Sequence, residues 1–344
     1  MNSSIMNLIV VGTTGLVGQE FIKLLEKKIF KVNFFFVASK NSVGKKIFFC
    51  DNEYKLITLD QIDYKQRNIF INCASSEVAM CIHAKMSKNS ILIDNSSYFR
   101  LNRNVSLVIP EINFPYKLQQ IYANPNCSTI MLACLLEPLR KFGIKRVVVS
   151  TYQAASGAGK KGLDELDLQM KQLINNEELT TQFWGKQFVS NVMVHNSPIE
   201  NMYNGEEIKI MKETNKIFNS EFKITATCIR VPVQRSHCES VNIEFENKIT
   251  YEDIVTIISQ TSYLTLMDCK KNKDFPDSLS STNSTKVQVG HIRPDHSLDY
   301  DNNNFSGWNF WISGDQLLRG AAYNAFLIFD KIIYRLLECK VSRI

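Results

Sequence analysis

The 344-residue sequence lacks several features that would assign it to a particular class of protein. No apolar run reaches the length of a membrane-spanning helix, and no basic segment followed by an apolar stretch stands at the N-terminus. Lysines and arginines are scattered, so the formal net charge of +6 forms no basic stripe and suits an anionic small molecule better than a nucleic acid. We therefore expect no membrane span and no nucleic-acid partner.

Paired cysteines are missing too. The nine cysteines have no repeating spacing and no Cys-x-x-Cys motif, and the five histidines are dispersed. This pattern argues against a disulfide framework and against a metal site, and it predicts a reducing, cytoplasmic compartment. What is present is an ordinary globular composition, 44% hydrophobic and 22% charged, in a chain long enough for two domains.

A glycine-containing turn follows the first apolar stretch, residues 6–11, and precedes a helical pattern over residues 19–28. Strand, glycine turn and helix in this order form the context of a dinucleotide-binding fingerprint, although the spacing here is G-x-x-G-x-x-G. In that interpretation Gly12 permits the tight turn, Gly15 lets the backbone approach a pyrophosphate, and Gly18 allows close helix–strand packing. The alternative is a plain structural turn. The turn reads Gly12-Thr13-Thr14-Gly15-Leu16-Val17-Gly18.

The second predicted strand, residues 34–38, ends at Ser39-Lys40-Asn41-Ser42. A free ribose 2′-hydroxyl usually meets an acidic residue at this place, whereas a 2′-phosphate needs hydroxyls and a cation. The loop has no acidic residue, and Ser39, Lys40 and Ser42 supply hydroxyls and a cation. The loop therefore favours NADP over NAD, unless Lys40 is only a solvated loop residue.

Apolar runs at residues 69–73, 91–93 and 105–109 extend the predicted parallel sheet, with a helix over residues 78–86. Arg100 follows one strand end, where α/β sheets bind their ligands, and is a candidate anion-binding residue. The alternative is an ordinary surface arginine.

Cys127 lies in the loop Asn124-Pro125-Asn126-Cys127-Ser128-Thr129-Ile130, just before an apolar helical run, residues 131–139. A cysteine in the first turn of a helix faces unpaired backbone N–H groups and the positive end of the helix dipole, which favour the thiolate. The sequence therefore places a thiol nucleophile here. The alternative is a small buried hydrophobic residue.

The second half contains further candidates. A strand over residues 147–153 delivers Gln153 into a loop of small residues, 154–160, which precedes a helix over 163–173 and presents N–H groups to a cofactor or an oxyanion. Residues 175–197 read as an excursion from the sheet, either a helical subdomain or a dimer contact. A helix over residues 206–217 carries Glu206 and Lys209 on one face, where a solvated ion pair is the alternative.

His237 stands between two predicted strands, 222–232 and 240–245, and is a usable general base at neutral pH, with a structural histidine as the alternative. Arg230 precedes it across a proline-containing turn. Strands over residues 285–289 and 308–312 follow. A long amphipathic helix runs from Asp315 close to the C-terminus, and we expect it to pack against the first domain.

Six of these segments, in this order and with comparable spacing, resemble aspartate-semialdehyde dehydrogenase of the bacterial type. The resemblance implies a Rossmann domain over residues 1–127, completed by the C-terminal helix, residues 315–344. It also implies a catalytic and dimerisation domain of the α+β class over residues 128–314, with a mixed sheet like that of glyceraldehyde-3-phosphate dehydrogenase, in a homodimer. The matching segments are Gly12–Gly18, Asn95–Arg100, Asn124–Ile130, Gln153–Gly159, Arg230–Val233 with His237, and Ser313–Ala322.

The activity implied by the resemblance is an NADP-dependent reductive dephosphorylation of L-aspartyl-4-phosphate to L-aspartate 4-semialdehyde. This reaction is a shared step toward threonine, methionine and, through diaminopimelate, lysine. By position, Cys127 is the nucleophile, His237 the acid/base, and Gln153 orients the thioester intermediate.

The resemblance also assigns binding residues. Arg230 holds the substrate carboxylate and Glu206 meets the amino group. The family commonly has an arginine where this chain has Asn41, so Lys40 is the available cation for a 2′-phosphate. The implied phosphate-binding residues are Arg100, Asn126 and Lys209. The implied cofactor-binding residues are Gly12, Thr13, Thr14, Gly15, Leu16, Val17, Gly18, Ser39, Lys40, Ser42, Ser156, Gly157 and Gln316.

Two other interpretations stay open. N-acetyl-γ-glutamyl-phosphate reductase shares the nucleotide-binding half and the Cys/His chemistry, but its acetylated substrate has no ammonium group for Glu206 to pair with. A non-catalytic relative would keep the fold and bind nucleotide without turnover. Such a relative is expected to lose the nucleophile or the base, whereas this chain retains both.

Overall fold

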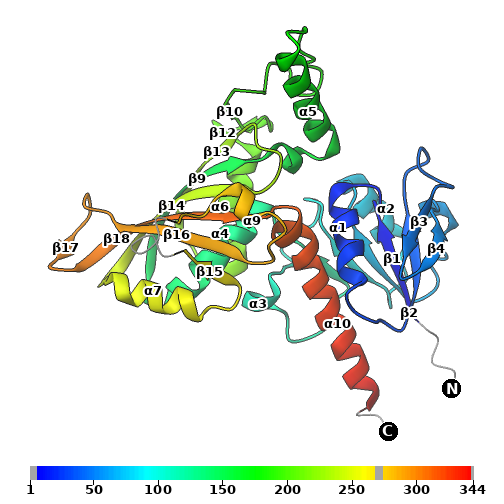
Figure 1. The fold of residues 1–344 in the computed structure, drawn as a ribbon. Coiled ribbons are helices and arrows are strands. Elements are labelled where there is room, and N and C mark those ends of the chain that lie inside the picture. Colours follow the sequence, from blue (N-terminus) through cyan, green and yellow to red (C-terminus); the bar gives the residue numbers. More distant parts are fainter. Residues whose placement is uncertain (1–5, 268–273, 342–344) are drawn as a thin grey trace. The chain divides into compact units, whose positions relative to one another are not determined.

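The computed structural model describes residues 6–267 and 274–341 (Figure 1). The chain divides into two compact units. Unit 1 comprises residues 1–126 and 321–344, and unit 2 comprises residues 127–320. The C-terminal segment therefore belongs to the same unit as the N-terminal segment.

Unit 1 is built on a six-stranded sheet with the order β2-β1-β5-β6-β8-β7, in which every pairing is parallel. Its central strands are buried on both faces, which explains why they read as continuous apolar runs. The predicted parallel sheet is therefore confirmed. The strands are β1 (Met6–Val11), β2 (Val32–Val37), β5 (Asn68–Asn72), β6 (Ile91–Asp94), β7 (Ser106–Leu107) and β8 (Ile121–Ala123).

Helices and a hairpin complete unit 1. The sequence did not predict the hairpin, whose turn residues Cys50 and Asp51 both have positive φ, nor the three-residue strand β8. The remaining elements are α1 (Leu16–Leu25), the hairpin β3 (Lys46–Phe49) and β4 (Asn52–Lys55), the 3-10 helix η1 (Leu59–Gln61), α2 (Ser76–Lys85) and α3 (Pro110–Asn113).

The C-terminal helix α10 (Tyr323–Val341) packs against α1 within unit 1. The ring of Phe21 lies edge-on to Phe326 and Phe329 at centroid distances of 6.3 and 6.4 Å, and Lys28 forms an ion pair with Asp330. The helix was expected to start at Asp315, but a π-helix, η4 (Leu318–Ala322), precedes it. Residues 342–344 of the expected helix lie outside the described residues.

Unit 2 is built on an eight-stranded mixed sheet with the order β10-β13-β9-β14-β18-β16-β15, and β17 pairs with β18. The pairs β13–β9 and β15–β16 are parallel and the others are antiparallel, so the predicted mixed sheet is confirmed. The strands are β9 (Ile144–Gln153), β10 (Met193–Val194), β13 (Lys223–Arg230), β14 (His237–Ile249), β15 (Leu264–Leu266), β16 (Val287–Pro294), β17 (Tyr300–Asp301) and β18 (Asn304–Gly314).

Helices cover one face of this sheet. The helix α4 (Cys127–Leu139) is apolar on nearly every side and contacts α6 (Gly205–Phe218), α7 (Tyr251–Gln260) and the strands. On β9 the residues Val147 and Val149 of this face are buried, whereas Val148 and Tyr152 on the opposite face are partly exposed. The unit thus has one covered sheet face and one more open face.

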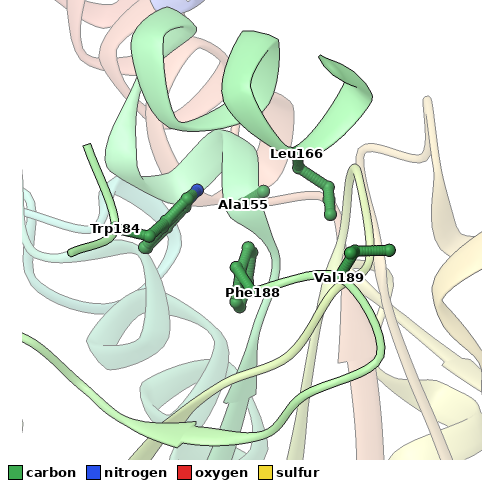
Figure 2. Close-up of a cluster of buried hydrophobic side chains, with 5 residues drawn as sticks. All are labelled: Ala155, Leu166, Trp184, Phe188 and Val189. Carbon is green, nitrogen blue, oxygen red and sulfur yellow. The ribbon is translucent and has the colours of Figure 1, made fainter. Parts of the chain in front are cut away.

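The excursion predicted at residues 175–197 packs on α5 (Lys160–Ile174). Figure 2 shows its apolar centre, Ala155, Leu166, Trp184, Phe188 and Val189. The expected helical subdomain is wrong for residues 175–197 themselves, which form turns, bends and β10.

Side chains of α5 accept the hydrogen bonds of backbone amides in this segment, which in a helix would go to backbone carbonyls. The Glu165 carboxylate accepts hydrogen bonds from the amides of Phe183 and Trp184. Gln169 accepts from the amides of residues 188 and 189.

Short elements connect the larger ones of unit 2. They are the 3-10 helices η2 (Arg140–Phe142) and η3 (Ala155–Ala158), the hairpin β11 (Ile199–Glu200) and β12 (Tyr203–Asn204), and α9 (Ser278–Ser281). Among residues 6–267 and 274–341, no helix is both long and apolar enough to cross a membrane.

Candidate functional site

The glycine turn of unit 1 has the geometry that the sequence predicted. Gly12 has φ +84°, and a Cβ there would lie 2.8 Å from the Cys73 carbonyl oxygen. A Cβ on Gly18 would lie 2.3 Å from the Gly12 carbonyl oxygen, so only glycine fits. Gly15 stands at the N-cap of α1 with no side-chain cap. The first turn of α1 has no acidic residue, and its N–H groups therefore suit an anion.

A cavity of about 430 Å³ adjoins this turn. Five predicted cofactor residues line it: Gly12, Thr14, Gly15, Ser39 and Lys40. Thr13, Leu16, Val17, Gly18 and Ser42 support the turn or the neighbouring loop and are not among the lining residues.

Asp60, which sequence reasoning missed, lines the same cavity. A hydrogen bond from Thr58 lowers the pKa of Asp60, and the charge of Lys40 adds to this effect. A carboxylate thus lies near the cation expected to bind a 2′-phosphate. Asp60 follows Lys40 by twenty positions, so no local motif indicated it.

Arg100 is a buried residue of unit 1, which excludes an ordinary surface arginine. Its Nε donates to the Asn124 carbonyl oxygen at 2.8 Å, and its Nη2 donates to the Asn95 carbonyl oxygen at 2.7 Å. The Asn124 side chain in turn bonds to Asn95 and Asn324. Asn126, also buried, follows in the same loop. The guanidinium is therefore oriented by the backbone.

Cys127 is the first residue of α4, and its side chain is partly exposed. The cysteine therefore lies in the first helical turn, as predicted. A Cβ on Gly320 would lie 2.8 Å from the Cys127 Cβ, so Gly320 provides the space beside it.

Three strand ends meet at one edge of the unit 2 sheet and carry predicted site residues. Gln153 ends β9 and pairs with Arg230 at the end of the parallel strand β13. His237 begins the antiparallel strand β14, three residues earlier than the predicted strand and not between two strands. Because opposite residues on neighbouring strands share a face, these three side chains belong together.

The Gln153 side chain is fixed by two acceptors. Its Nε2 donates to the Ser128 hydroxyl at 3.0 Å and to Glu206 Oε1 at 3.1 Å. Its Oε1 is buried and has no hydrogen-bond partner among the described residues. A buried oxygen without a partner is well placed to accept a hydrogen bond from a bound ligand. Glu206 Oε2 pairs with Lys209 at 3.1 Å, and the carboxylate is buried, so the ion pair is not a fully solvated one.

Arg230 and His237 share the backbone of Ala154. Arg230 Nη1 donates to the Ala154 carbonyl at 3.2 Å, and the Ala154 amide donates to His237 Nδ1 at 3.0 Å. The neutral ring therefore carries its proton on Nε2, which is buried and has no partner within the described chain. Burial, reinforced by the Arg230 charge, lowers the pKa of His237 to about 3.

Electrostatics connect Cys127 to the same group of side chains. Burial lowers the pKa of Arg230, and the charges of Glu206 and Cys127 oppose that effect. Cys127 therefore lies close enough to interact with the guanidinium. Gly157 packs against the group, since a Cβ there would lie 2.8 Å from both Arg230 Nη1 and His237 Cε1.

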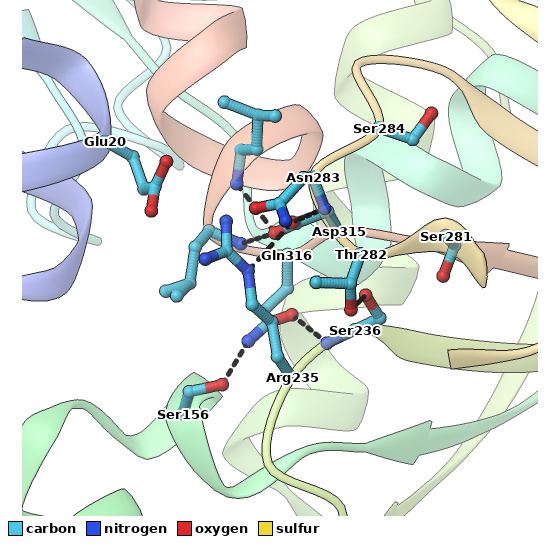
Figure 3. Close-up of polar contacts among 12 residues, drawn as sticks. Glu20, Ser156, Arg235, Ser236, Ser281, Thr282, Asn283, Ser284, Asp315 and Gln316 are labelled. Carbon is cyan, nitrogen blue, oxygen red and sulfur yellow. Dashed lines mark hydrogen bonds and ion pairs between the residues drawn. The ribbon is translucent and has the colours of Figure 1, made fainter. Parts of the chain in front are cut away.

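A second polar group holds the loop that carries Gly157 (Figure 3). Gln316 Oε1 accepts from the Ser236 amide at 2.7 Å, and its Nε2 donates to the Ser156 hydroxyl at 2.5 Å. Arg235 and the buried Asp315 form an ion pair at 2.8 Å beside it. The predicted cofactor residues Ser156 and Gln316 thus bond to each other in unit 2.

Sequence reasoning missed three further residues of this region: Ser128, His195 and Glu239. Burial raises the pKa of Glu239 well above its usual value, and the neighbouring Ser128 hydroxyl opposes that effect. The alternation of β14 places Glu239 on the same face as His237, which is a signal in the sequence. The described residues contain no group of three or more side chains suited to hold a metal ion.

Comparisons with known proteins cover nearly the whole chain. Residues 7–121 match a family model described as semialdehyde dehydrogenase, NAD binding domain, and residues 136–319 match one described as semialdehyde dehydrogenase, dimerisation domain. The chain is 36% identical to the aspartate-semialdehyde dehydrogenase of Rickettsia bellii, covering 95% of this chain and 97% of the relative. It is 34% identical to that of Bacillus subtilis, covering 95% and 97%.

Solved structures show the same likeness. Aspartate semialdehyde dehydrogenase II from Vibrio cholerae superimposes with a TM-score of 0.87 at 33% identity, covering 95% of this chain and 98% of the other. The structure of that enzyme complexed with ASA has a TM-score of 0.88 at 32% identity, covering 96% and 99%.

Proposed function

Because this chain belongs to the family of aspartate-semialdehyde dehydrogenases, we propose that it converts L-aspartyl-4-phosphate to L-aspartate 4-semialdehyde with NADP as cofactor. The observation that carries the proposal is the convergence of Gln153, Arg230 and His237 at one edge of the unit 2 sheet, with Cys127 in electrostatic contact with Arg230. A nucleophile, a proton donor and a carboxylate ligand are the groups that this reaction requires.

Cys127 is the proposed nucleophile. Its thiolate attacks the acyl carbonyl, the carbon–sulfur bond forms, and inorganic phosphate leaves with the bonding electrons. The helix N-terminus favours the thiolate. Gln153 orients the thioester, and its unpartnered Oε1 supports a contact with the substrate. Arg100, Asn126 and Lys209 are the proposed phosphate ligands. The two cations neutralise the negative charge of the leaving phosphate, and the Asn126 amide donates a hydrogen bond to it.

His237 is the proposed proton donor. The nicotinamide cofactor supplies a hydride for reduction of the thioester carbonyl. His237 Nε2 shares its proton with the developing oxyanion through a hydrogen bond and keeps it when the hemithioacetal collapses, which releases the aldehyde and the Cys127 thiolate with no net proton transfer. The Ala154 amide bonded to Nδ1 supports this hydrogen bond, because it leaves the ring proton on Nε2.

The substrate head group is assigned to two buried side chains. Arg230 suits a carboxylate because its planar fork pairs with two oxygens, and Glu206 suits the ammonium group. Glu206 and Lys209 pair with each other in the free protein. When substrate binds, Glu206 pairs with the substrate ammonium group and Lys209 pairs with the phosphate.

The cofactor is assigned to the glycine turn and its cavity. The lining by Gly12, Gly15, Ser39 and Lys40 fits a dinucleotide whose pyrophosphate meets the α1 N-terminus. Lys40 supports NADP, while the neighbouring Asp60 weakens the pull of that cation on a 2′-phosphate. We therefore propose NADP with a modest preference over NAD.

The assembly and setting complete the proposal. The more open face of the unit 2 sheet, with partly exposed Tyr152 and Trp311, supports a homodimer. The pathway is the aspartate-derived synthesis of lysine, threonine and methionine, in the cytoplasm. The partners are the small-molecule substrate and phosphate, with no nucleic acid and no membrane.

The test is an oxidation assay in the reverse direction. Purified protein is mixed with aspartate semialdehyde, with or without phosphate, and with NADP or NAD. We expect nucleotide reduction that requires phosphate and is faster with NADP, and no reduction by the Cys127→Ala variant, which still binds NADP. Phosphate-dependent oxidation of N-acetylglutamate semialdehyde alone would assign the acetylated-substrate reductase, and nucleotide binding without turnover of either aldehyde would assign a non-catalytic relative.

A further inference from the structure

We infer that His195 is a positioning residue that holds the Arg230 guanidinium for the substrate carboxylate, an inference that rests on the proposed function. His195 follows the edge strand β10 and is buried. Its backbone amide donates to the Cys228 carbonyl at 2.8 Å, which anchors it beside the strand that carries Arg230. No motif of the sequence marks this position.

The contact between the two side chains fixes the state of the ring. His195 Nε2 lies 2.7 Å from Arg230 Nη2. A guanidinium only donates, so Nε2 accepts and the ring proton is on Nδ1. Nδ1 then donates to the Ser197 hydroxyl at 3.1 Å, and the Ser197 amide is directed at the same nitrogen at 3.2 Å. Burial and the Arg230 charge lower the pKa of His195 to about 4, which keeps the ring neutral.

The same ring connects the two proposed head-group ligands. The Ser197 hydroxyl that accepts from His195 also accepts from the Glu206 amide at 3.0 Å. A continuous chain of hydrogen bonds therefore runs from Arg230 through His195 and Ser197 to the start of α6, where Glu206 lies. These hydrogen bonds set the spacing between Arg230, which pairs with the substrate carboxylate, and Glu206, which pairs with the substrate ammonium.

The role of His195 follows from what else holds Arg230. The Ala154 carbonyl is the acceptor for Nη1, and His195 is the acceptor for Nη2. Without the ring acceptor, the Ala154 carbonyl is the one acceptor left for the guanidinium among the described residues, so the guanidinium can turn about that contact. A carboxylate that needs two parallel hydrogen bonds loses one of them. A purely structural histidine would alter stability and leave substrate affinity unchanged.

The experiment compares two amides of different reach. His195→Gln places an acceptor near the position of Nε2, whereas His195→Asn reaches only the position of Nδ1. We expect His195→Asn to raise the KM for aspartate semialdehyde roughly tenfold, the size of one lost charge-assisted hydrogen bond, with kcat within about twofold of the wild type. We expect His195→Gln to restore KM to within about threefold of the wild type. Equal KM values for both variants and the wild type would overturn the inference, as would a fall in kcat alone.

Controls separate the possible failures. The KM for NADP and the thermal unfolding midpoint report on folding and on the nucleotide site, and both should match between the two variants. If His195→Asn does not fold, Ser197→Ala is the second probe. It removes the acceptor of Nδ1 and should raise the same KM by about threefold, and an unchanged KM would reject the role of His195. A wild type without phosphate-dependent activity overturns the proposed function, whereas an active wild type with unaffected variants overturns only this inference.

Discussion

The close packing of Gly157 allows a prediction about catalysis. A methyl group there would lie 2.8 Å from Arg230 Nη1 and His237 Cε1 and 2.9 Å from His237 Nε2. Ordinary van der Waals contact begins at 3.4 Å, so Gly157→Ala forces both groups to move by roughly 0.6 Å or forces the loop to shift. Neither side chain moves freely, because both are hydrogen-bonded to Ala154.

The expected loss in kcat/KM is about ten- to a hundredfold, because a displacement near 1 Å of a reacting group costs on the order of a hundredfold. The expected loss in stability is only about 1–3 kcal/mol, the usual cost of overpacking. The assay is phosphate-dependent NADP reduction at varied aspartate semialdehyde, with thermal unfolding followed by circular dichroism. Gly205→Ala is the matched control, because its Cβ would meet no atom closer than 3.6 Å. Unchanged kcat/KM in Gly157→Ala would refute the placement of this loop against the reacting groups.

Three further predictions follow from other parts of the chain. Gly18→Ala should abolish nucleotide binding or folding of unit 1, because its Cβ would lie 2.3 Å from the Gly12 carbonyl oxygen; normal NADP affinity by fluorescence titration would contradict this. Glu239→Gln should gain stability relative to the wild type as pH rises from about 5 to 8, because a raised pKa means that the folded state keeps a proton which the unfolded chain releases; parallel melting curves across that range would reject the buried neutral acid. Asp60→Asn should increase the NADP-to-NAD ratio of kcat/KM and Lys40→Ala should decrease it, and a ratio that stays constant in both would remove this pair from the cofactor site.

Much of the fold could be predicted because the signals were local. The buried parallel strands of unit 1 read as apolar runs, and Gly12 and Gly18 stand where the backbone leaves no room for a side chain. Cys127 was placed at a helix start by the proline-containing loop before it. Elements without such signals were missed: β8 has three residues, and the hairpin formed by β3 and β4 turns at Cys50 and Asp51 rather than at glycine.

The candidate site could be predicted only where its residues stand in motifs. Gln153, Arg230 and His237 lie at strand ends, and alternation along a strand assigns them to a face. His195 lies in a segment with no periodicity, and its contact with Arg230 depends on tertiary pairing across 35 positions. Residues 175–197 were likewise not assigned correctly, because their backbone amides donate to the Glu165 and Gln169 side chains of α5 and not to carbonyls within a helix.

The central claim is that Cys127 carries the acyl group during turnover. The most direct measurement is intact-protein and peptide mass spectrometry after mixing the enzyme with aspartate semialdehyde and NADP in the absence of phosphate. The account predicts an aspartyl thioester on the peptide that contains Cys127, which disappears when phosphate is added. An unmodified Cys127 peptide under these conditions, together with full activity of Cys127→Ala, would contradict it.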